Sequence, residues 1–243
     1  MSFSRKVFIP LTNLCRNACG YCGFRREPSA KDACFLTPER VMEIAYGGMK
    51  LGCREALFTL GERPEEKYPE ARAELERLGY SSTSHYLRDK CEEVFRKTGL
   101  FPHSNPGILS QGEIAVLREV NVSMGLMLEN VSSRLCGRNQ PHEFSPGKNP
   151  SLRLTVMEYA GKLQVAFTSG ILLGVGETLQ ERVNSLFALG KLHHQYGHIQ
   201  EVIIQPFRAK KGTPMQNSPE PSPEDILRTV ATARIILGGE MNI

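Results

Sequence analysis

The 243-residue sequence contains no tryptophan, no long apolar run and no extended run of like charges. None of its apolar stretches approaches the roughly 18 residues that a membrane-spanning helix needs. The first apolar stretch is short and is interrupted by Pro10, which is unlike a secretory signal. The 30 basic and 26 acidic residues leave a net charge of +4, without a basic tract typical of nucleic-acid binding. We therefore expect a cytoplasmic protein that binds neither membranes nor nucleic acid.

Cysteine is present in an uneven pattern. Three of the seven cysteines, Cys15, Cys19 and Cys22, fall within one short segment. The other four are scattered: Cys34, Cys53, Cys91 and Cys136. A secreted disulfide scaffold would be smaller and more evenly cross-linked. The scattered cysteines are typical of small buried apolar residues, and only Cys136, in a long loop, is a candidate to test. The triplet indicates metal ligation.

Short β-rich runs alternate with longer amphipathic segments along the chain. Strands are expected at residues 6–12, 55–61, 100–104, 121–129, 165–173 and 201–207. Helices are expected between and after them, at residues 37–52, 81–97, 110–120, 151–161, 178–196 and 222–237. Thr37, Thr178 and Ser222 are of the residue types that cap helix N-termini, and each stands where one of these helices begins.

The order of these elements predicts the fold class. Six βα units in a row favour a parallel sheet. Because no GxGxxG motif follows the first strand, we predict an α/β fold of the TIM type, a complete or partial βα barrel. A flavodoxin-like open sheet is the alternative. We expect residues 1–243 to form one domain. Residues 239–243 look like the start of a seventh strand, so we expect the last units of the barrel to be missing from this chain.

The cysteine triplet directly follows the first strand, on the face where barrels place their active sites. Thiolates suit iron, and the spacing Cys15-x₃-Cys19-x₂-Cys22 can hold three corners of a 4Fe–4S cluster while one iron stays open. A zinc site usually needs four ligands in paired spacing, and no second CxxC is present. A thioredoxin-like pair would use only Cys19 and Cys22. We therefore predict a 4Fe–4S cluster.

This CxxxCxxC motif after the first strand of a βα barrel resembles the signature of the radical S-adenosylmethionine (SAM) superfamily. The resemblance implies that SAM chelates the open iron through its amino and carboxylate groups. Tyr21, the aromatic residue before the third cysteine, is similar to the position whose backbone contacts the adenine; a packing role is the alternative. Gly61 and Glu62 resemble the end of the Gly-Gly-Glu motif that holds the SAM amino group, with Leu60 replacing the first glycine. A solvated turn glutamate is the alternative.

A second stretch resembles another motif of this superfamily. Residues 170–177 are similar to the GxIxGxxE pattern that packs under the adenine. Gly170, Gly174 and Glu177 occupy its fixed positions, so the resemblance implies that they contribute to cofactor binding. A bulge or a turn would explain the glycines equally well.

Three polar residues at strand ends are catalytic candidates. Glu129 closes the fourth expected strand and could bind a ribose hydroxyl or a substrate nitrogen, or form a surface salt bridge. His103 and Asn105 end the third strand and could line a site, or could shape the turn that follows.

Longer phrases narrow the resemblance to one family. They are residues 12–24, 61–65, 123–129, 145–148 and 169–177. They are similar to the first subunit of deazaflavin (FO) synthase, over essentially the whole chain. This resemblance implies the cyclisation of a hydroxybenzyl–ribitylaminouracil adduct, derived from tyrosine and a ribitylamino-pyrimidine, to 7,8-didemethyl-8-hydroxy-5-deazariboflavin with loss of ammonia. It implies as partners a sister subunit, which makes the adduct, and a low-potential electron donor such as ferredoxin or flavodoxin.

Two other functions stay open. Another radical SAM activity of similar build, such as biotin synthase, a hydrogenase maturase or an enzyme of menaquinone synthesis, would act on a different substrate. A non-catalytic iron–sulfur or zinc protein, acting as a sensor or an electron carrier, would not cleave SAM when a reductant is supplied. The absence of a fourth ligand near the triplet argues against this second alternative.

Overall fold

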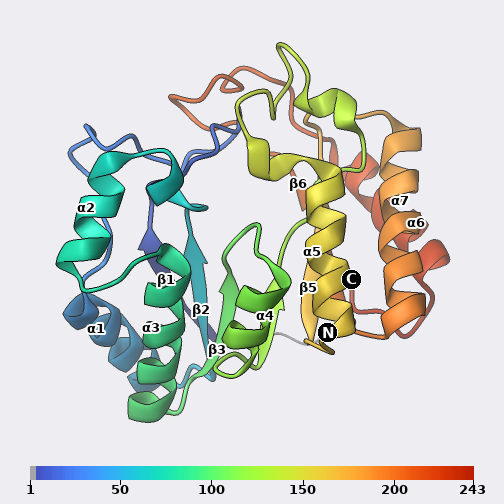
Figure 1. Cartoon of the computed structure of the whole chain (residues 1–243). Helices are drawn as coiled ribbons and strands as arrows, with labels where there is room; N and C mark the ends of the chain where they lie inside the picture. The colour runs from blue at the N-terminus through green and yellow to red at the C-terminus, as the bar shows by residue number, and fades with distance from the viewer. Residues whose placement is uncertain (1–3) are drawn as a thin grey trace. The chain divides into compact units, whose positions relative to one another are not determined.

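The computed structural model describes residues 4–243 (Figure 1). The chain forms two compact units. The first comprises Met1–Arg16 and Phe24–Gly125, and the second comprises Asn17–Gly23 and Leu126–Ile243. The cysteine loop contributes to both, because Cys15 belongs to the first unit while the other two cysteines of the triplet belong to the second. The expectation of a single domain stays a prediction.

The first unit contains four parallel strands in the order β1-β2-β3-β4. Its elements are β1 (Lys6–Thr12), α1 (Pro38–Lys50), β2 (Glu55–Leu60), the 3₁₀ helix η1 (Pro64–Glu66), α2 (Pro69–Arg77), α3 (Thr83–Thr98), β3 (Phe101–Asn105), α4 (Gln111–Arg118) and β4 (Ser123–Gly125). The expected alternation of strands and helices is confirmed. Helix α2 was not expected, because a helix that buries only Ala71 and Leu75 leaves almost no apolar periodicity in the sequence.

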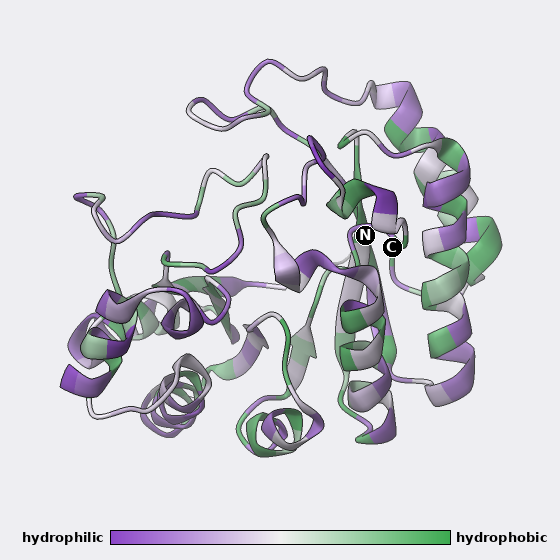
Figure 2. Cartoon of the chain, turned by 45° about the horizontal axis from the view of Figure 1, so that its top comes forward, coloured by the Kyte–Doolittle hydropathy of each residue, from purple (hydrophilic) through white to green (hydrophobic). Residues whose placement is uncertain are grey.

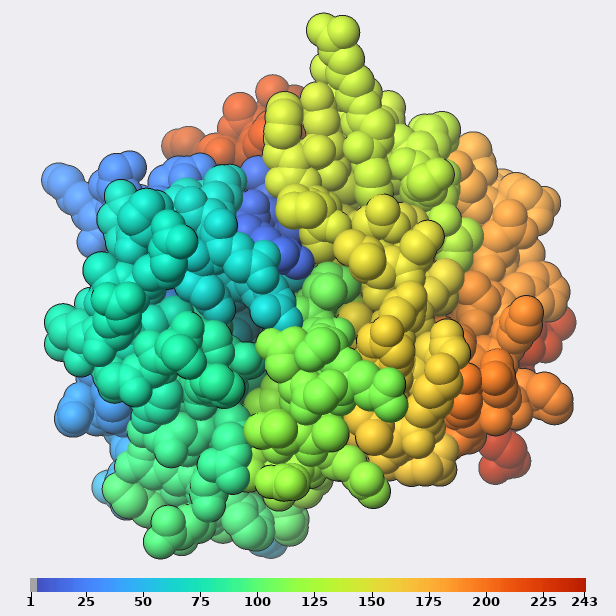
Figure 3. All heavy atoms as spheres, in the orientation of Figure 1, coloured from blue at the N-terminus to red at the C-terminus, as the bar shows by residue number. Residues whose placement is uncertain are grey.

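Helix caps account for where the helices of this unit begin. The Thr37 side chain accepts the amide N–H of Arg40, and Pro38 follows at the first helical position of α1, as expected. Ser110 and Glu113 form a capping box at α4. In Figure 1, helices α3 and α4 lie in front of the strands of this unit, and in the space-filling view from the same side their segments form the surface there (Figure 3). The helices mix hydrophilic and apolar residues along each turn (Figure 2), as helices with one packed face do.

The second unit contains two parallel strands, β5 and β6. Its elements are the 3₁₀ helices η2 (Ser133–Cys136) and η3 (Pro146–Lys148), followed by α5 (Pro150–Lys162), β5 (Phe167–Leu173), α6 (Leu179–Tyr196), β6 (Ile199–Pro206) and α7 (Pro223–Leu237). Thr178 forms the expected capping box with Glu181, and Ser222 caps α7. Asn242 forms an isolated parallel bridge with Glu201, which agrees with the expected start of another strand.

The fourth strand is shorter than expected. Residues 121–129 were expected to be extended, but β4 ends at Gly125. Within the second unit, the N–H groups of Leu126 and Glu129 donate to Thr168 and Gly170 of β5 without forming a continuous ladder. Glu129 has a φ of 63°, a left-handed conformation that an extended strand cannot contain.

No helix among residues 4–243 is long and apolar enough to cross a membrane.

Candidate active site

Glu62 is the centre of a polar cluster in the first unit. It follows β2 directly, and only 4% of its surface is exposed. Its Oε1 accepts a hydrogen bond from Arg16 Nε at 2.9 Å and lies 2.7 Å from Arg16 Nη2, while its Oε2 accepts the amide N–H of Ile108 at 3.2 Å. One guanidinium and one backbone amide therefore balance this buried carboxylate.

The same residue contacts the first cysteine of the triplet. The Glu62 amide N–H donates to Cys15 Sγ at 3.2 Å, and the Arg16 amide N–H donates to the Glu62 carbonyl at 3.0 Å. Hydrogen bonds of this kind to sulfur stabilise a thiolate and tune iron–sulfur clusters. A Cβ atom on Gly61 would overlap the carbonyl oxygen of Leu14, so only glycine lets the cysteine loop lie against the end of β2.

Gly107 packs against Glu62, and Arg63 with Glu113 holds the turn at Ile108 that contacts it; sequence reasoning missed these contacts. Gly107 has a φ of 86° and packs against the Glu62 side chain, so that a Cβ atom there would lie 2.5 Å from Glu62 Cγ. Arg63 Nε donates to the Ile108 carbonyl at 2.9 Å, and its Nη2 lies 2.7 and 2.6 Å from the two oxygens of Glu113. The Asn-Pro-Gly sequence before Ile108 did predict a turn. It did not indicate that this turn would contact Glu62.

His103 and Asn105, the two catalytic candidates of the third strand, both lie on β3 in the first unit. Both lie on the same face of β3, two residues apart. His103 Nδ1 lies 2.7 Å from the Ser123 hydroxyl of β4. Burial, together with the charge of Lys6, lowers the pKa of His103 to about 4. The ring is therefore neutral at physiological pH.

Cys19 and Cys22 lie in a tightly anchored loop of the second unit. The Cys22 amide N–H donates to the Cys19 carbonyl at 3.0 Å, which closes a turn between the two cysteines. The amides of Ala18 and Gly20 donate to the carbonyls of Phe144 and Pro141 at 2.9 and 2.8 Å. These bonds hold the cysteine loop against residues 141–144.

Tyr21 lies between these two cysteines and is paired with a histidine. Its hydroxyl lies 3.1 Å from His142 Nε2, and the two rings meet edge to face with centroids 5.6 Å apart. Burial, followed by the charges of Glu129 and Cys19, raises the pKa of Tyr21 well above its usual value. Burial and Lys148 lower the pKa of His142 to about 4. Both partners are therefore neutral, and the phenol can donate to the imidazole.

Glu129 is a buried anion in the second unit. Its carboxylate forms an ion pair with Lys148, and only 7% of the residue is exposed. Burial raises the pKa of Glu129, but the charges of Lys148 and Arg153 outweigh it and hold the pKa below its ordinary value. Arg153 donates from Nε to the Gly147 carbonyl at 2.8 Å and from Nη1 to the carbonyl of Met127. Glu129 therefore forms an internal ion pair instead of the suggested surface salt bridge, and its pairing with Lys148 was not expected from the sequence.

The three positions of the glycine-rich motif shape the end of β5. The Glu177 side chain is fully buried; it accepts the amides of Gly174 and Val175, both at 2.8 Å, and it pairs with Arg182 at 2.7 Å. Gly174 has a φ of 84°, which favours glycine. A Cβ atom on Gly170 would overlap a backbone oxygen of β6. These residues fix the backbone where β5 ends.

The donor set of the triplet suits an iron–sulfur cluster. None of the seven cysteines, all of which lie in the described chain, forms a disulfide, and Cys15, Cys19 and Cys22 are each partly buried. Within residues 4–243, no three histidine, cysteine, aspartate or glutamate side chains stand close enough to hold a metal ion. Because the cysteines belong to two separate units, their convergence on one cluster stays a prediction.

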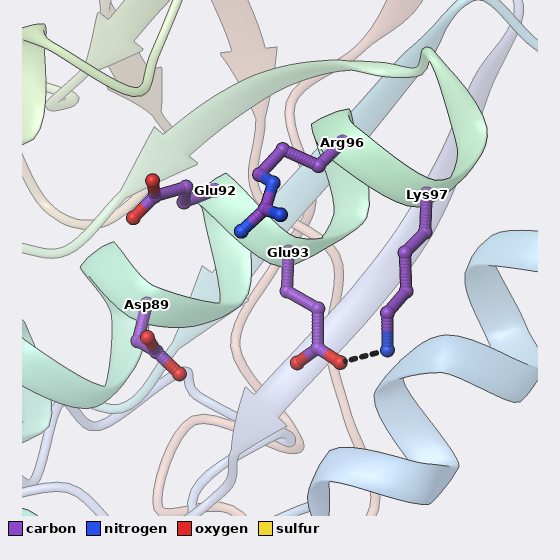
Figure 4. A pocket seen from close by; sticks show the side chains of 5 residues that line it. All are labelled: Asp89, Glu92, Glu93, Arg96 and Lys97. Atoms are coloured by element: carbon purple, nitrogen blue, oxygen red, sulfur yellow. Dashed lines mark hydrogen bonds and ion pairs between the residues drawn. The ribbon is translucent and has the colours of Figure 1, made fainter.

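A charged depression on the surface of α3 has none of the features of a functional site. Its lining comes from one helix: Asp89, Glu92, Glu93, Arg96 and Lys97 (Figure 4). Glu93 and Lys97 form an ion pair of 2.6 Å one helical turn apart, as solvated helix faces commonly do. This depression carries no chemistry beyond that of a charged surface.

The comparison with family models gives the class of the protein. The model of the radical SAM superfamily matches residues 9–189. This segment contains the cysteine triplet, Glu62, Glu129 and the glycine-rich end of β5. The chain belongs to the radical SAM superfamily, whose members use a 4Fe–4S cluster and SAM.

Curated relatives identify the family within this superfamily. The chain is 55% identical, over 98% of its length and 71% of the relative, to 7,8-didemethyl-8-hydroxy-5-deazariboflavin synthase of Methanopyrus kandleri. It is 48% identical, over its full length, to FO synthase of Nocardia farcinica, of which it covers only 29%. Within the superfamily, the chain belongs to the family of deazariboflavin (FO) synthases.

Solved structures confirm the predicted fold class. The [FeFe]-hydrogenase maturase HydG of Carboxydothermus hydrogenoformans matches 96% of this chain with a TM-score of 0.74, at 21% identity; the chain covers 52% of that structure. SuiB of Streptococcus suis, solved bound to S-adenosylmethionine, matches 99% of this chain with a TM-score of 0.65, at 12% identity; the chain covers 50% of it. Six parallel strands alternating with helices are therefore the βα architecture of radical SAM enzymes.

Proposed function

We propose that this chain carries the radical ring closure of deazaflavin synthesis. In this reaction the hydroxybenzyl–ribitylaminouracil adduct loses hydrogen, its ring closes, and ammonia is released to give 7,8-didemethyl-8-hydroxy-5-deazariboflavin. The single observation that carries the proposal is the 55% identity to a named synthase over nearly the whole chain. The buried, charge-balanced residues beside the cysteine loop support it.

Cys15, Cys19 and Cys22 hold the 4Fe–4S cluster in this proposal. When bound, the cluster and SAM supply a hydrogen-abstracting radical after one-electron reduction. The protein stabilises the Cys15 thiolate through the Glu62 N–H at 3.2 Å, and it fixes Cys19 and Cys22 through the closed turn between them. Three thiolates leave one iron free to bind the amino and carboxylate groups of SAM.

Glu62 accepts the SAM amino group. An ionised carboxylate offers about four acceptor positions. Arg16 and the Ile108 amide occupy part of this capacity, so the carboxylate can accept a further hydrogen bond from an ammonium group. Gly61 keeps the cysteine loop close enough for the same residue to contact both Cys15 Sγ and the ligand.

The second unit binds the nucleoside part of SAM. Glu129 stays ionised beside Lys148 and accepts the ribose hydroxyls. The backbone at Tyr21 contacts the adenine, while the phenol stays bonded to His142. Gly170, Gly174 and Glu177 hold the end of β5 in place beneath the adenine. We assign none of these SAM-binding side chains as the base that removes protons during cyclisation.

The partners follow from the chemistry. A sister subunit makes the adduct, and the Nocardia farcinica FO synthase, which is much longer than this chain, supports the two activities occurring together in one polypeptide. A low-potential protein such as ferredoxin or flavodoxin supplies the electron. We place the enzyme in the cytoplasm, because cluster thiolates are stable in a reducing compartment.

Anaerobic reconstitution with iron and sulfide tests this function. The wild-type protein should form 5′-deoxyadenosine from SAM and fluorescent deazaflavin from the adduct. Cys15→Ala, Cys19→Ala and Cys22→Ala should each abolish both products and bleach the cluster absorbance. Cys34→Ala, at an exposed cysteine outside the loop, is the matched control and should retain both. Zinc, or a cluster with four protein thiolates, in the anaerobically purified protein would overturn the proposal.

A further inference from the structure

An open pocket of about 570 Å³, which we call the loop pocket, lies on the second unit beside the cysteine loop. Four segments of this unit contribute to its lining: Ala18 and Gly20 of the cysteine loop, residues 139–144, residues 174–176 and residues 214–219. Gly20 joins two of these segments to the loop, because its amide N–H donates to the Pro141 carbonyl at 2.8 Å and its carbonyl accepts the amide N–H of Met215 at 3.0 Å. The loop pocket is therefore built on the cysteine loop itself.

The segment after β6 also covers the end of the cysteine loop. Gly23 directly follows Cys22 and is exposed. A Cβ atom on Gly23 would lie 3.3 Å from both Cβ and Cγ of Lys210, so the stem of this lysine lies against the loop. Cys19 stands between Ala18 and Gly20, which both line the loop pocket. The loop pocket and its rim therefore border the backbone of two of the three proposed cluster ligands.

The rim of the loop pocket carries an excess of positive charge. Residues 138–144 and 208–220 contain four cations and two carboxylates: Arg138, Arg208, Lys210 and Lys211 against Glu143 and Glu220. Arg208 is paired with Glu220 at 2.7 Å. Within residues 4–243, the other three cations form no ion pair, and all three are exposed. Unpaired cations grouped in this way attract a partner that presents carboxylates.

Apolar side chains line the same pocket. Phe144 is 68% exposed, although it is a large aromatic residue. Pro214, Met215 and Pro219 add apolar surface from the segment after β6. Met215 packs against a buried apolar cluster that includes Phe207, so this side of the pocket is anchored to the core. Aromatic and methionine side chains are enriched in protein interfaces, and interfaces for electron transfer are small, so a patch of this size is sufficient for one.

We propose that the loop pocket and its rim of Arg138, Lys210 and Lys211 are the docking surface for an acidic electron-carrier protein, with Phe144 as its apolar contact. The inference rests on the proposed function, because it needs a cluster that the loop holds. Electron transfer weakens steeply with distance, so the carrier has to dock where the cluster ligands lie close to the surface. The carrier is oxidised by one electron and the cluster is reduced by one. Carboxylates around the carrier's cofactor face the three cations.

Charge reversal at Lys211 tests the electrostatic part. Isothermal titration of oxidised flavodoxin into the anaerobically reconstituted full chain measures docking without turnover. Lys211→Glu should raise the dissociation constant about two- to 25-fold, because it loses one attraction and adds one repulsion, each of the size of an exposed ion pair. Wild-type binding should weaken as salt is added. Lys191→Glu is the matched control: this exposed lysine also forms no ion pair in the described chain, and it lies about 18 Å along α6 from the helix end that follows Gly176.

Phe144→Ala tests the apolar part. The alanine keeps the backbone carbonyl that accepts the Ala18 amide N–H at 2.9 Å, so the loop stays anchored. The variant should weaken flavodoxin binding by about fivefold or more, the effect that alanine has at a residue that contributes to an interface. Phe187→Ala is the matched control, because it removes a ring of α6 that is 58% exposed. This control should bind flavodoxin as the wild type does.

The choice of reductant separates docking from catalysis. With dithionite, a small reductant that needs no docking surface, all four variants should form 5′-deoxyadenosine at the wild-type rate. With reduced flavodoxin, only Lys211→Glu and Phe144→Ala should be slow.

Wild-type flavodoxin affinity in both test variants would overturn the docking surface, as would equal weakening by the two controls or loss of the dithionite-driven reaction in the test variants. It would also be overturned if the wild type bound neither flavodoxin nor an acidic ferredoxin. A wild type that cleaves SAM with both reductants but forms no deazaflavin from the adduct would refute the proposed function and leave the docking surface standing.

Discussion

Gly107→Ala tests whether the turn after β3 positions Glu62 for SAM. At a φ of 86°, alanine adopts a left-handed conformation at a cost of about 1–2 kcal/mol. The new Cβ would also lie 2.5 Å from Glu62 Cγ and 2.8 Å from Glu62 Cδ, so the carboxylate has to move. Arg16 and the Ile108 amide hold this carboxylate, and its displacement breaks at least one of these bonds.

The expected loss of SAM affinity follows from the bond that Glu62 would make. A hydrogen bond that involves a charged group contributes about 1.5–3 kcal/mol, so its loss should weaken SAM binding by about 10- to 150-fold. Equilibrium dialysis of SAM against the anaerobically reconstituted protein measures this change. The cluster itself should assemble normally, because the alanine leaves the cysteines untouched.

Gly99→Ala separates backbone strain from the clash. Gly99 has a φ of 71° at the end of α3, and a Cβ atom there would meet nothing within 4 Å. Both variants should therefore lose about 1–2 kcal/mol of unfolding free energy, but only Gly107→Ala should lose SAM affinity. Wild-type SAM binding by Gly107→Ala would refute the positioning of Glu62 by this turn, and equal loss in Gly99→Ala would assign the effect to stability.

Three further predictions concern buried groups. Burial lowers the pKa of His103 and of His142 from 6.5 to about 4. Their neutral rings contribute stability that is complete above pH 6.5 and is lost as the pH falls towards 4, so urea midpoints should drop across that range. Glu177→Gln should cost about 2 kcal/mol in urea unfolding, because it leaves the buried Arg182 facing a neutral amide. Tyr21→Phe should lower stability by about 1 kcal/mol through the lost bond to His142 and should leave SAM affinity unchanged, since only the backbone is assigned to the adenine.

A control variant or a contradicting outcome tests each of these predictions. Glu224→Gln removes an ion pair with Arg228 on the exposed surface of α7, where 71% of the glutamate side chain is accessible, and should change stability by less than about 1 kcal/mol. Equal losses in this variant and in Glu177→Gln would contradict the importance of burial. A urea midpoint that stays constant between pH 6.5 and 4 would contradict the neutral histidines. Weaker SAM binding by Tyr21→Phe would assign the phenol itself to the ligand.

Local signals explain most of what the sequence predicted correctly. The helix starts at Thr37, Thr178 and Ser222 depend on a side chain bonding an amide three residues away, and such pairs are visible in the sequence. The end of β4 was misplaced because the left-handed backbone of Glu129 follows from its surroundings, and its own residue type gives no signal. Helix α2 was missed because little of it is buried.

The support of the candidate site could not be predicted, because its members are far apart in the chain. Arg63 and Glu113 are 50 residues apart, and each alone looks like a surface charge. Glu129 and Lys148 lie on either side of a loop with no periodic pattern. Strand register places Phe8 beside Leu57 and Thr59 beside Asn105 only after the strands have paired, so these neighbours could not be predicted from the sequence.

Glu62 and Glu129, the two carboxylates that we assign to SAM, are each buried beside a cation, and this arrangement has a chemical consequence. A buried anion without a partner would be costly, and it would take up a proton instead of staying ionised. Arg16 balances Glu62, and Lys148 with Arg153 holds the pKa of Glu129 below its ordinary value. Glu129 can thus accept a hydrogen bond from a hydroxyl group without first losing a proton, and the Arg16 guanidinium offsets the negative charge of Glu62. An Arg16→Met variant, which keeps the length of the side chain without its charge, should therefore impair SAM binding even though its cysteines are unchanged.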